Sequence, residues 1–401
     1  MVTFDGPAPT NLFIVSIDTL RWDRIGRYGG GDQSPYIDLL LAGGVTLGRH
    51  RSCSNWTYPS MLCILTGNTG AEIETLPVGG TGPYLSPSQP TLADFLRDEG
   101  YQSSLVATNG FVGLTPYELS NRFDQSLLYR YDTIDTVAPV ILQEAEALLD
   151  GKAPFYLHAH LMDVHTPYYM HKGFTDIVDK DMLEVFDESN VETWALLTPA
   201  EQEALLLEIN ALYDGEIRYL DQRLQELFVD LDALGALDDT LVVFVSDHGE
   251  QFQEHDWWLH AKTLYGEETR ALMGFWSKNI VPASLPYNTG HSDVVPTIMA
   301  ALGLAEPPEV GGVVMGMRMP DEPIFSYHVI PKGGSVAVDV DGERLLFDLR
   351  TGSLEYYVDD PFEVHNLGLI DRKAALALFE THLRAEAERT ADILGISMAE
   401  P

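Results

Sequence analysis

Two short segments of this 401-residue chain carry side chains that could share one metal ion. Asp18 follows the apolar, β-rich run Asn11–Ile17, and Asp247-His248 follows a second such run, Leu241–Ser246. Two carboxylates with an imidazole suit zinc, manganese or iron better than calcium. Taken alone, Asp-His-Gly is equally a surface turn, so the prediction of a metal site depends on its combination with Asp18.

Thr57 is the candidate nucleophile. Pro59 suits the first turn of a helix, and Met61–Leu65 is an apolar run that predicts a buried helix ending at Gly67. Thr57 would then stand just before the helix, where free N–H groups and the helix dipole favour an oxyanion. This threonine is either an N-cap or a nucleophile, and this window alone favours the cap. The predicted ligands of one divalent ion, Mn or Zn, are Asp18, Thr57, Asp247 and His248.

Buried strands alternate with helices along residues 1–320. The predicted strands are Asn11–Ile17, Gln102–Ala107, Pro154–Leu161 and Leu241–Ser246, and the predicted helices are Tyr36–Gly43, Thr91–Glu99, Thr136–Leu149 and Glu201–Leu231. A Gly/Pro/Ser-rich loop is expected at Val78–Pro90. This alternation predicts an α/β fold with a large, mostly parallel sheet between helices, and the carboxyl ends of such strands carry sites.

The pattern changes in residues 321–401, which we expect to form a separate subdomain. Four short apolar segments are separated there by Gly-containing turns, which predicts a small antiparallel sheet. A terminal helix is expected at Arg372–Leu394.

Composition limits the partners and the location of the protein. Acidic residues number 61 against 24 basic ones, a net charge of −37, which argues against nucleic acid or an anionic membrane as a standing partner. This charge reflects either solubility or a high-salt habitat. No run reaches the roughly 18 apolar residues of a membrane span, and residues 1–11 do not resemble a signal peptide. Cys53 and Cys63 are expected to be buried thiols, so we expect a cytoplasmic protein.

Eight motifs follow one another along nearly the whole chain: Asp18–Arg21, Asn55–Gly67, Met162–Tyr168, Tyr213–Asp221, Val242–Glu250, Leu259–Tyr265, Asp293–Thr297 and Phe347–Leu367. Together they resemble the sulfatase-type members of the alkaline phosphatase superfamily. The resemblance implies a phosphatase-like α/β sandwich with a C-terminal four-stranded subdomain, in agreement with the pattern of elements.

The chain departs from that family at the nucleophile. Sulfatases carry Cys-x-Pro-x-Arg, or Ser in place of Cys, and the first residue is oxidised to formylglycine. Here the frame reads Thr57-Tyr58-Pro59-Ser60-Met61. Oxidation of a secondary alcohol gives a ketone, the arginine is replaced by Met61, and both cysteines are out of frame. The threonine form resembles the superfamily's phosphatases, nucleotide phosphodiesterases and phosphoglycerol or phosphoethanolamine transferases.

We therefore expect a metal-dependent hydrolase of small-molecule phosphate esters, mono- or diesters, that forms a covalent phosphothreonine at Thr57. The alternatives are a phosphotransferase to an alcohol acceptor and a family member with only weak sulfatase activity. A non-catalytic binding protein is disfavoured, because the nucleophile and the metal ligands are all retained. The oligomeric state is left open, a homo-oligomer included.

The resemblance also suggests roles for further polar residues. His165 and His260 are candidates to contact the phosphoryl group and to protonate the leaving group. Lys262 and Asn109 are candidate substrate ligands, although a solvated lysine and an Asn-Gly turn are the simple alternatives. The candidate ligands of a second metal are Asp163, His165, His260 and His291. His158 and His160 alternate on a buried strand, and a core role is expected for both.

Overall fold

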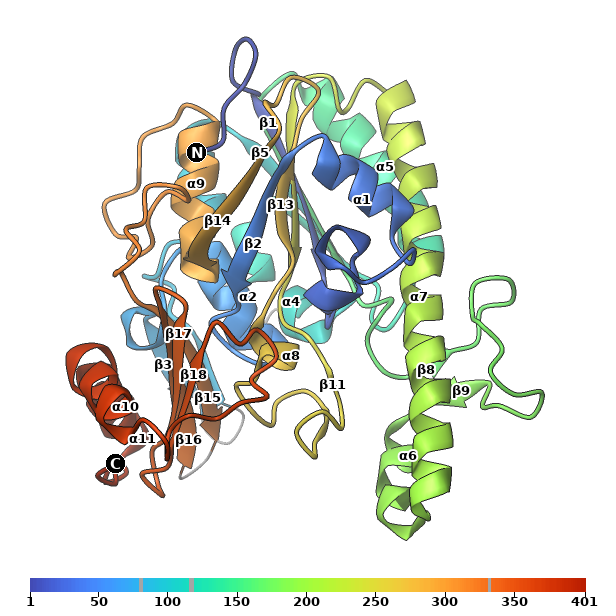
Figure 1. Cartoon of the computed structure of the whole chain (residues 1–401). Helices are drawn as coiled ribbons and strands as arrows, with labels where there is room; N and C mark the ends of the chain where they lie inside the picture. Colours follow the sequence, from blue (N-terminus) through green and yellow to red (C-terminus); the bar gives the residue numbers. More distant parts are fainter. Residues whose placement is uncertain (79–81, 115–118, 331–332) are drawn as a thin grey trace.

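The computed structural model describes residues 1–78, 82–114, 119–330 and 333–401, and a large sheet lies at its centre (Figure 1). The strands of this sheet are β1 (Asn11–Ile17), β2 (Val45–Arg51), β5 (Gln102–Ala107), β6 (Gln125–Leu128), β7 (Phe155–Leu161), β10 (Thr240–Ser246), β13 (Met273–Trp276) and β14 (Ala283–Gly290). They are ordered β14-β2-β13-β10-β1-β7-β5-β6. Every pair is parallel except the two that β13 makes, so the predicted parallel core is confirmed.

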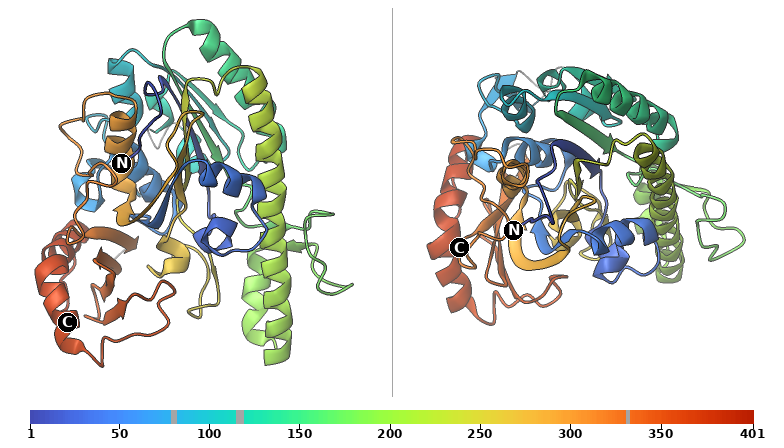
Figure 2. Two further views of the ribbon diagram at one scale, coloured as in Figure 1. Left: turned by 45° about the horizontal axis from the view of Figure 1, so that its top comes forward. Right: turned by 90° about the horizontal axis from the view of Figure 1, so that it is seen from above.

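Helices cover both faces of the sheet (Figures 1 and 2). One face packs on α1 (Pro35–Ala42), α5 (Ile134–Gly151) and α7 (Pro199–Ala233). The other face packs on α2 (Thr57–Thr66), α3 (Leu92–Asp98), α4 (Gly110–Gly113) and α9 (Val294–Ala301). Along β1, Phe13 and Val15 point into the first core while Leu12 and Ile14 point into the second. This two-residue period, with both faces buried, explains why consecutive residues in the middle of the strand are apolar.

The helix α7 confirms the long amphipathic helix predicted at Glu201–Leu231. It begins with a capping box, in which Thr198 and Glu201 satisfy each other's backbone N–H groups. Its N-terminal half extends beyond the sheet, beside α6 (Glu188–Thr193) (Figure 1). The chain between β7 and α6 carries the short strands β8 (Tyr168–Tyr169) and β9 (Val185–Phe186), which pair with each other.

The C-terminal part forms a small antiparallel sheet, as predicted. Its strands, in spatial order, are β15 (Ile324–Ile330), β16 (Gly333–Val340), β17 (Glu343–Asp348) and β18 (Leu354–Val358). The sheet packs on α10 (Arg372–Leu378) and α11 (Arg384–Leu394) through a core of its own that includes Val338, Phe347 and Phe379. A π-helical turn, Phe379–Leu383, joins the two helices where one continuous helix was expected. The division at residue 320 stays a prediction.

The segment expected to be a loop at Val78–Pro90 contains secondary structure. A hairpin is formed by β3 (Thr75–Val78) and β4 (Gly82–Leu85), and residues 79–81 lie outside the described residues. Gly and Pro are typical of loops. Both strands of a two-stranded ribbon are edge strands, however, and edge strands tolerate Pro because its missing N–H can face away from the partner strand. Three further short elements, β11 (Gln251–Phe252), β12 (Trp258–Leu259) and α8 (Gly266–Thr269), follow the strand β10.

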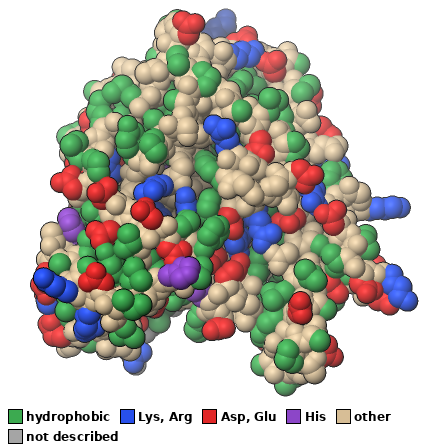
Figure 3. Space-filling model, viewed as in Figure 1, with side chains coloured by type: hydrophobic (Ala, Val, Ile, Leu, Met, Phe, Trp, Pro, Cys, Tyr) green, Lys and Arg blue, Asp and Glu red, His purple; other side chains and the backbone are tan. Residues whose placement is uncertain are grey.

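Acidic side chains are spread over the face shown in Figure 3, as the composition requires, and basic side chains gather at fewer places. None of the helices in the described ranges is long and apolar enough to cross a membrane.

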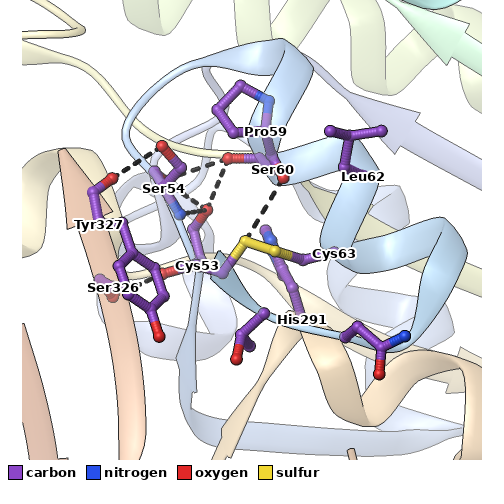
Figure 4. Close-up of a disulfide and its surroundings, with 12 residues drawn as sticks. Cys53, Ser54, Pro59, Ser60, Leu62, Cys63, His291, Ser326 and Tyr327 are labelled. Carbon is purple, nitrogen blue, oxygen red and sulfur yellow. Dashed lines mark hydrogen bonds between the residues drawn. A yellow bond between two sulfur atoms is a disulfide. The ribbon is translucent and has the colours of Figure 1, made fainter. Parts of the chain in front are cut away.

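The prediction that Cys53 and Cys63 are separate thiols is wrong, because the two form a disulfide (Figure 4). Cys63 lies on the part of α2 that faces the chain just after β2, which brings the two Cα atoms to 6.5 Å. The two cysteines come close because α2 folds back against β2. Their spacing of ten residues in the sequence does not reveal this path. Disulfides persist mainly in oxidising compartments, so the cytoplasmic location, which rested in part on free thiols, stays only a prediction.

Candidate active site

The carboxyl ends of three adjacent parallel strands bring the site together. Ile17, the last residue of β1, is paired with Ser246 of β10 and with Leu161 of β7. Asp18 and Asp247 therefore leave the sheet side by side, and His160 lies one residue before the end of the third strand. This is the edge at which open α/β sheets carry their sites.

Four buried atoms at this edge have no hydrogen-bond partner among the described residues: Asp18 Oδ1, Asp247 Oδ2, His160 Nε2 and His248 Nε2. His248 Nε2 lies 3.5 Å from Asp18 Oδ1 and 3.6 Å from Asp247 Oδ2. His160 Nε2 lies 3.5 Å from the other oxygen of Asp18. Unpaired buried charges are costly, and a divalent cation between these atoms would satisfy all four. The mixed oxygen and nitrogen donors fit zinc, manganese or iron.

The imidazole of His248 is prepared to act as a ligand. Its Nδ1 lies 2.9 Å from the carbonyl oxygen of Gly249 and must donate to it, so Nε2 presents a lone pair. Burial lowers the pKa of His248 to about 3, with the nearby His260 adding to the effect, which keeps the ring neutral at pH 7. The ring of His160 is held by Ser16, whose Oγ lies 2.8 Å from its Nδ1.

The two carboxylates respond to each other. Burial raises the pKa of Asp247 well above its usual value, and the negative charge of Asp18 raises it further. Burial also opposes ionisation of Asp18, but the neighbouring imidazoles of His160, His165 and His248 outweigh it and lower the pKa. A cation shared by the two would remove this repulsion, as expected for a metal site.

The expectation that His158 and His160 both have core roles is corrected for His160. His158 is satisfied by Ser16 Oγ at 2.8 Å and Tyr156 OH at 2.9 Å, as a core residue should be. His160 faces Asp18 instead, and with Asp18 and Asp247 it forms the only group of three metal-ligating side chains found in the described part of the chain. Its position beside Asp18 follows from the register of β7 against β1, and we find no sequence signal for it.

The hydroxyl of Thr57 points at the same carboxylate. Its Oγ1 lies 3.4 Å from Asp18 Oδ2 and 3.4 Å from Asn109 Nδ2, and the side chain is buried. Thr57 is the first residue of α2, and the N-cap is Trp56, so this threonine is not the cap. The position near a helix start was predicted, and the structure places the hydroxyl beside the Asp18 carboxylate.

Asn109 lies in the site, where the sequence placed it as a substrate ligand. Its Nδ2 donates to Asp18 Oδ2 at 2.6 Å, and its Oδ1 accepts from the backbone of Phe111 as the N-cap of α4. The cap fixes the orientation of the Asn109 amide. The sequence left open whether this asparagine forms a turn or lies in the site, and the structure shows that it does both.

His165 and His260 lie next to each other beside the carboxylates. Their ring centroids are 5.1 Å apart, and the ring of His260 is 4.7 Å from that of His248. His260 Nδ1 lies 2.8 Å from Glu250 Oε1. Burial lowers the pKa of His260, but the charge and hydrogen bond of Glu250 raise it to about 9. Glu250 also accepts from Tyr168 OH, and sequence reasoning gave it no role.

The four side chains suggested for a second metal do not converge. Asp163 accepts from the backbone N–H of Ile134 at the start of α5, and burial raises its pKa to about 7. His291 bonds the carbonyl of Ser246 at 3.2 Å and lies beside the disulfide (Figure 4). Lys262, the candidate substrate ligand, is exposed, and its backbone N–H donates to Glu268 Oε2 at 3.2 Å.

A family model described as Sulfatase matches residues 10–304 of the chain. Human N-acetylgalactosamine-6-sulfatase is 22% identical over 80% of this chain and 69% of its own length. Choline-sulfatase of Rhizobium meliloti is 33% identical over 23% of this chain, and a multifunctional alkaline phosphatase superfamily protein of Trinickia caryophylli is 34% identical over 25%. These two matches span 18% and 20% of the relatives' own lengths.

Solved structures show the same fold over nearly the whole chain. A putative sulfatase of Bacteroides fragilis superimposes with a TM-score of 0.73 at 19% identity, covering 98% of both chains. A phosphonate monoester hydrolase of Agrobacterium radiobacter superimposes with a TM-score of 0.71 at 18% identity, covering 94% of this chain and 96% of that one.

Proposed function

The chain belongs to the sulfatase family, and we propose that it is a metal-dependent hydrolase of small-molecule phosphate esters with Thr57 as its nucleophile. Sulfatase-family enzymes use a divalent metal ion, and the group Asp18, His160 and Asp247 fits one. The observation that carries the proposal is the orientation of the Thr57 hydroxyl toward Asp18, within this set of unpartnered buried ligand atoms.

The residues in the nucleophile frame favour phosphorus over sulfur. Thr57 stands where formylglycine would form from Cys or Ser, and Met61 stands where the family carries arginine. The sulfur atoms of Cys53 and Cys63 are bonded to each other, so neither is free for that oxidation. The Trinickia relative is described as multifunctional, and the Agrobacterium neighbour as a phosphonate monoester hydrolase, so this fold is compatible with reaction at phosphorus.

Asp18, Asp247, His160 and His248 would hold the ion, which lowers the pKa of an adjacent hydroxyl and offsets charge on phosphoryl oxygens. Thr57 Oγ1 attacks phosphorus in line, an Oγ1–P bond forms, and the bond from phosphorus to the leaving oxygen breaks. Asp18 Oδ2, 3.4 Å away, is the nearest acceptor for the hydroxyl proton. Asn109 Nδ2 is placed to donate to a phosphoryl oxygen as well.

The leaving oxygen needs a proton, and His260 is the candidate donor. Glu250 orients its ring through Nδ1, which leaves Nε2 to face the substrate, with His165 beside it. His260 then takes a proton from water, which attacks the phosphothreonine, breaks the Oγ1–P bond and releases phosphate. Thr57 recovers its proton in that step, so the two half-reactions together consume one water.

Sulfate-ester hydrolysis is the second candidate, because the human and Rhizobium relatives are named as sulfatases. We expect it to be slow, since the frame lacks both the formylglycine precursor and the arginine.

The two candidates are separated by turnover of p-nitrophenyl phosphate, bis-p-nitrophenyl phosphate and p-nitrophenyl sulfate with added Mn or Zn. We expect either phosphate substrate to exceed the sulfate, and faster sulfate turnover would overturn the assignment. Thr57→Ala should lower kcat by about 1000-fold or more, whereas Thr57→Ser, which keeps a hydroxyl, should retain measurable activity. Thr66→Ala serves as a control on the same helix, because the Thr66 hydroxyl bonds only nearby backbone groups: it donates to Leu62 O and accepts from the N–H of Asn68.

A further inference from the structure

A polar cavity of about 210 Å³ lies between the central sheet and the small C-terminal sheet, apart from the site described above. Its lining includes Arg49 and Arg51 of β2, Arg270 just after α8, and Arg344 of β17. Four guanidinium groups thus meet at one place in a chain whose 24 basic residues face 61 acidic ones. Figure 3 shows basic side chains gathering on this face, at the junction of the two parts.

Arg51 is buried but only partly satisfied. Its Nε donates to Asp339 at 3.0 Å, and its Nη2 is 3.4 Å from Glu363. Its Nη1 lies buried with no hydrogen-bond partner among the described residues. The Arg51 side chain lines the cavity. Two carboxylates, Asp339 and Glu363, hold its guanidinium group in place. Such a fixed, desolvated guanidinium is well suited to bind an oxyanion.

Arg270 differs from Arg51 in its partners. Within the described ranges it forms no ion pair; Nη2 donates to Gly48 O at 2.6 Å, and the guanidinium lies 3.7 Å above the ring of Trp22. Burial lowers its pKa to about 10, and the positive charge of Arg51 contributes. The two guanidinium groups therefore repel each other, and each has N–H donors without a partner among the described residues.

The carboxylates of the cavity are already engaged. Asp339 pairs with Arg51 and Arg344, and Asp359 pairs with the exposed Arg49 at 3.4 Å. Asp360 accepts from the backbone of His365 at 2.7 Å. The acceptors are thus used, while the donors of Arg51 and Arg270 remain, so an additional anion would complete the cluster.

We propose that this cavity is a second anion-binding site, which takes a tetrahedral oxyanion, phosphate or sulfate, between Arg51 and Arg270. The oxyanion is either the free ion or the charged end of a larger ligand, and the chemistry of recognition is the same. None of the lining residues belongs to the Asp18 centre, so the site does not depend on the proposed reaction.

The test is calorimetric titration of the full-length protein with inorganic phosphate and with sulfate at constant ionic strength. We expect two classes of site. Arg270→Gln should weaken one of them by about tenfold or more, the loss of a charge-assisted hydrogen bond, and Arg270→Lys should restore part of the affinity. Asp247→Asn should weaken binding at the Asp18 centre and leave binding at the arginine cavity intact.

Arg218→Gln is the matched control, because Arg218 is also mostly buried, at 20% exposure, and donates to a backbone carbonyl at 2.9 Å. The proposal is overturned if Arg270→Gln binds as the wild type does, or if Asp247→Asn abolishes all binding. Displacement by glycerol 2-phosphate, measured on Asp247→Asn, assigns the site to a phosphoryl group on a larger molecule. Failure to displace assigns it to the free ion. Since binding is read without turnover, a failure of the proposed hydrolase reaction would leave this result unchanged.

Discussion

Breaking the bond between Cys53 and Cys63 should destabilise the segment that carries the nucleophile. The two residues are ten positions apart, and Thr57 lies inside the loop that they close. In the chain-entropy description, a link over a loop of this length removes about 9 cal/mol/K from the unfolded chain, or about 2.8 kcal/mol at 25 °C. Reduction adds two electrons and two protons to give two thiols, and it removes no side chain.

The assay is equilibrium unfolding in urea at pH 7, with and without a reductant. With a slope of roughly 3 kcal/mol per M, a loss of about 2.8 kcal/mol lowers the midpoint by about 1 M. The double variant Cys53→Ala/Cys63→Ala is the control, since its midpoint should not respond to reductant. We also expect the reduced protein to hydrolyse phosphate esters more slowly, because Thr57 is positioned from within the loop.

A thiol titration of the urea-unfolded protein checks the premise. The chain has two cysteines, so we expect no free thiol before reduction and two after it. Two titratable thiols in the unreduced protein would refute the reasoning, and so would a midpoint that reductant does not move.

Two further predictions concern histidines. His160→Ala should lower the affinity for the activating metal by about 100-fold, measured by metal analysis after dialysis. The control His158→Gln should alter only stability. Equal metal content in the two variants would show that His160 is not a ligand. Burial lowers the pKa of His255, but its ion pair with Glu267, at 3.2 Å, raises it from 6.5 to about 9. The stabilisation is therefore complete below about pH 6.5 and is lost as the pH rises through 9, by roughly 1 kcal/mol once solvent screening is allowed for. His255→Gln should flatten the urea-midpoint profile between these pH values, and a profile like that of the wild type would count against the ion pair.

The sequence predicted those parts of the fold that depend on local pattern. β5 and β1 occupy the predicted residues, and β10 differs by one residue. β1 and β10 are mostly apolar runs, as buried strands are. Asp18 and Asp247 could be identified for the same reason, since each follows such a run directly. Their residue types then pointed to a metal.

What the sequence could not reveal depends on contacts between distant segments. His160 lies inside an apolar run, and only the register that pairs β7 with β1 turns it toward Asp18. The disulfide depends on the path of α2 relative to β2, and the arginine cavity joins β2 to β17, nearly 300 residues apart in sequence. No local period carries that information, which comes from tertiary packing.

The most direct test of the proposed reaction is to trap the covalent intermediate. The metal-loaded protein is mixed with a phosphate monoester, quenched in acid within the first turnover, and analysed by peptide mass spectrometry. We predict one added phosphoryl group, on Thr57, in the wild type and none in Thr57→Ala. Turnover without any label on Thr57, or a label on another residue, would contradict the account.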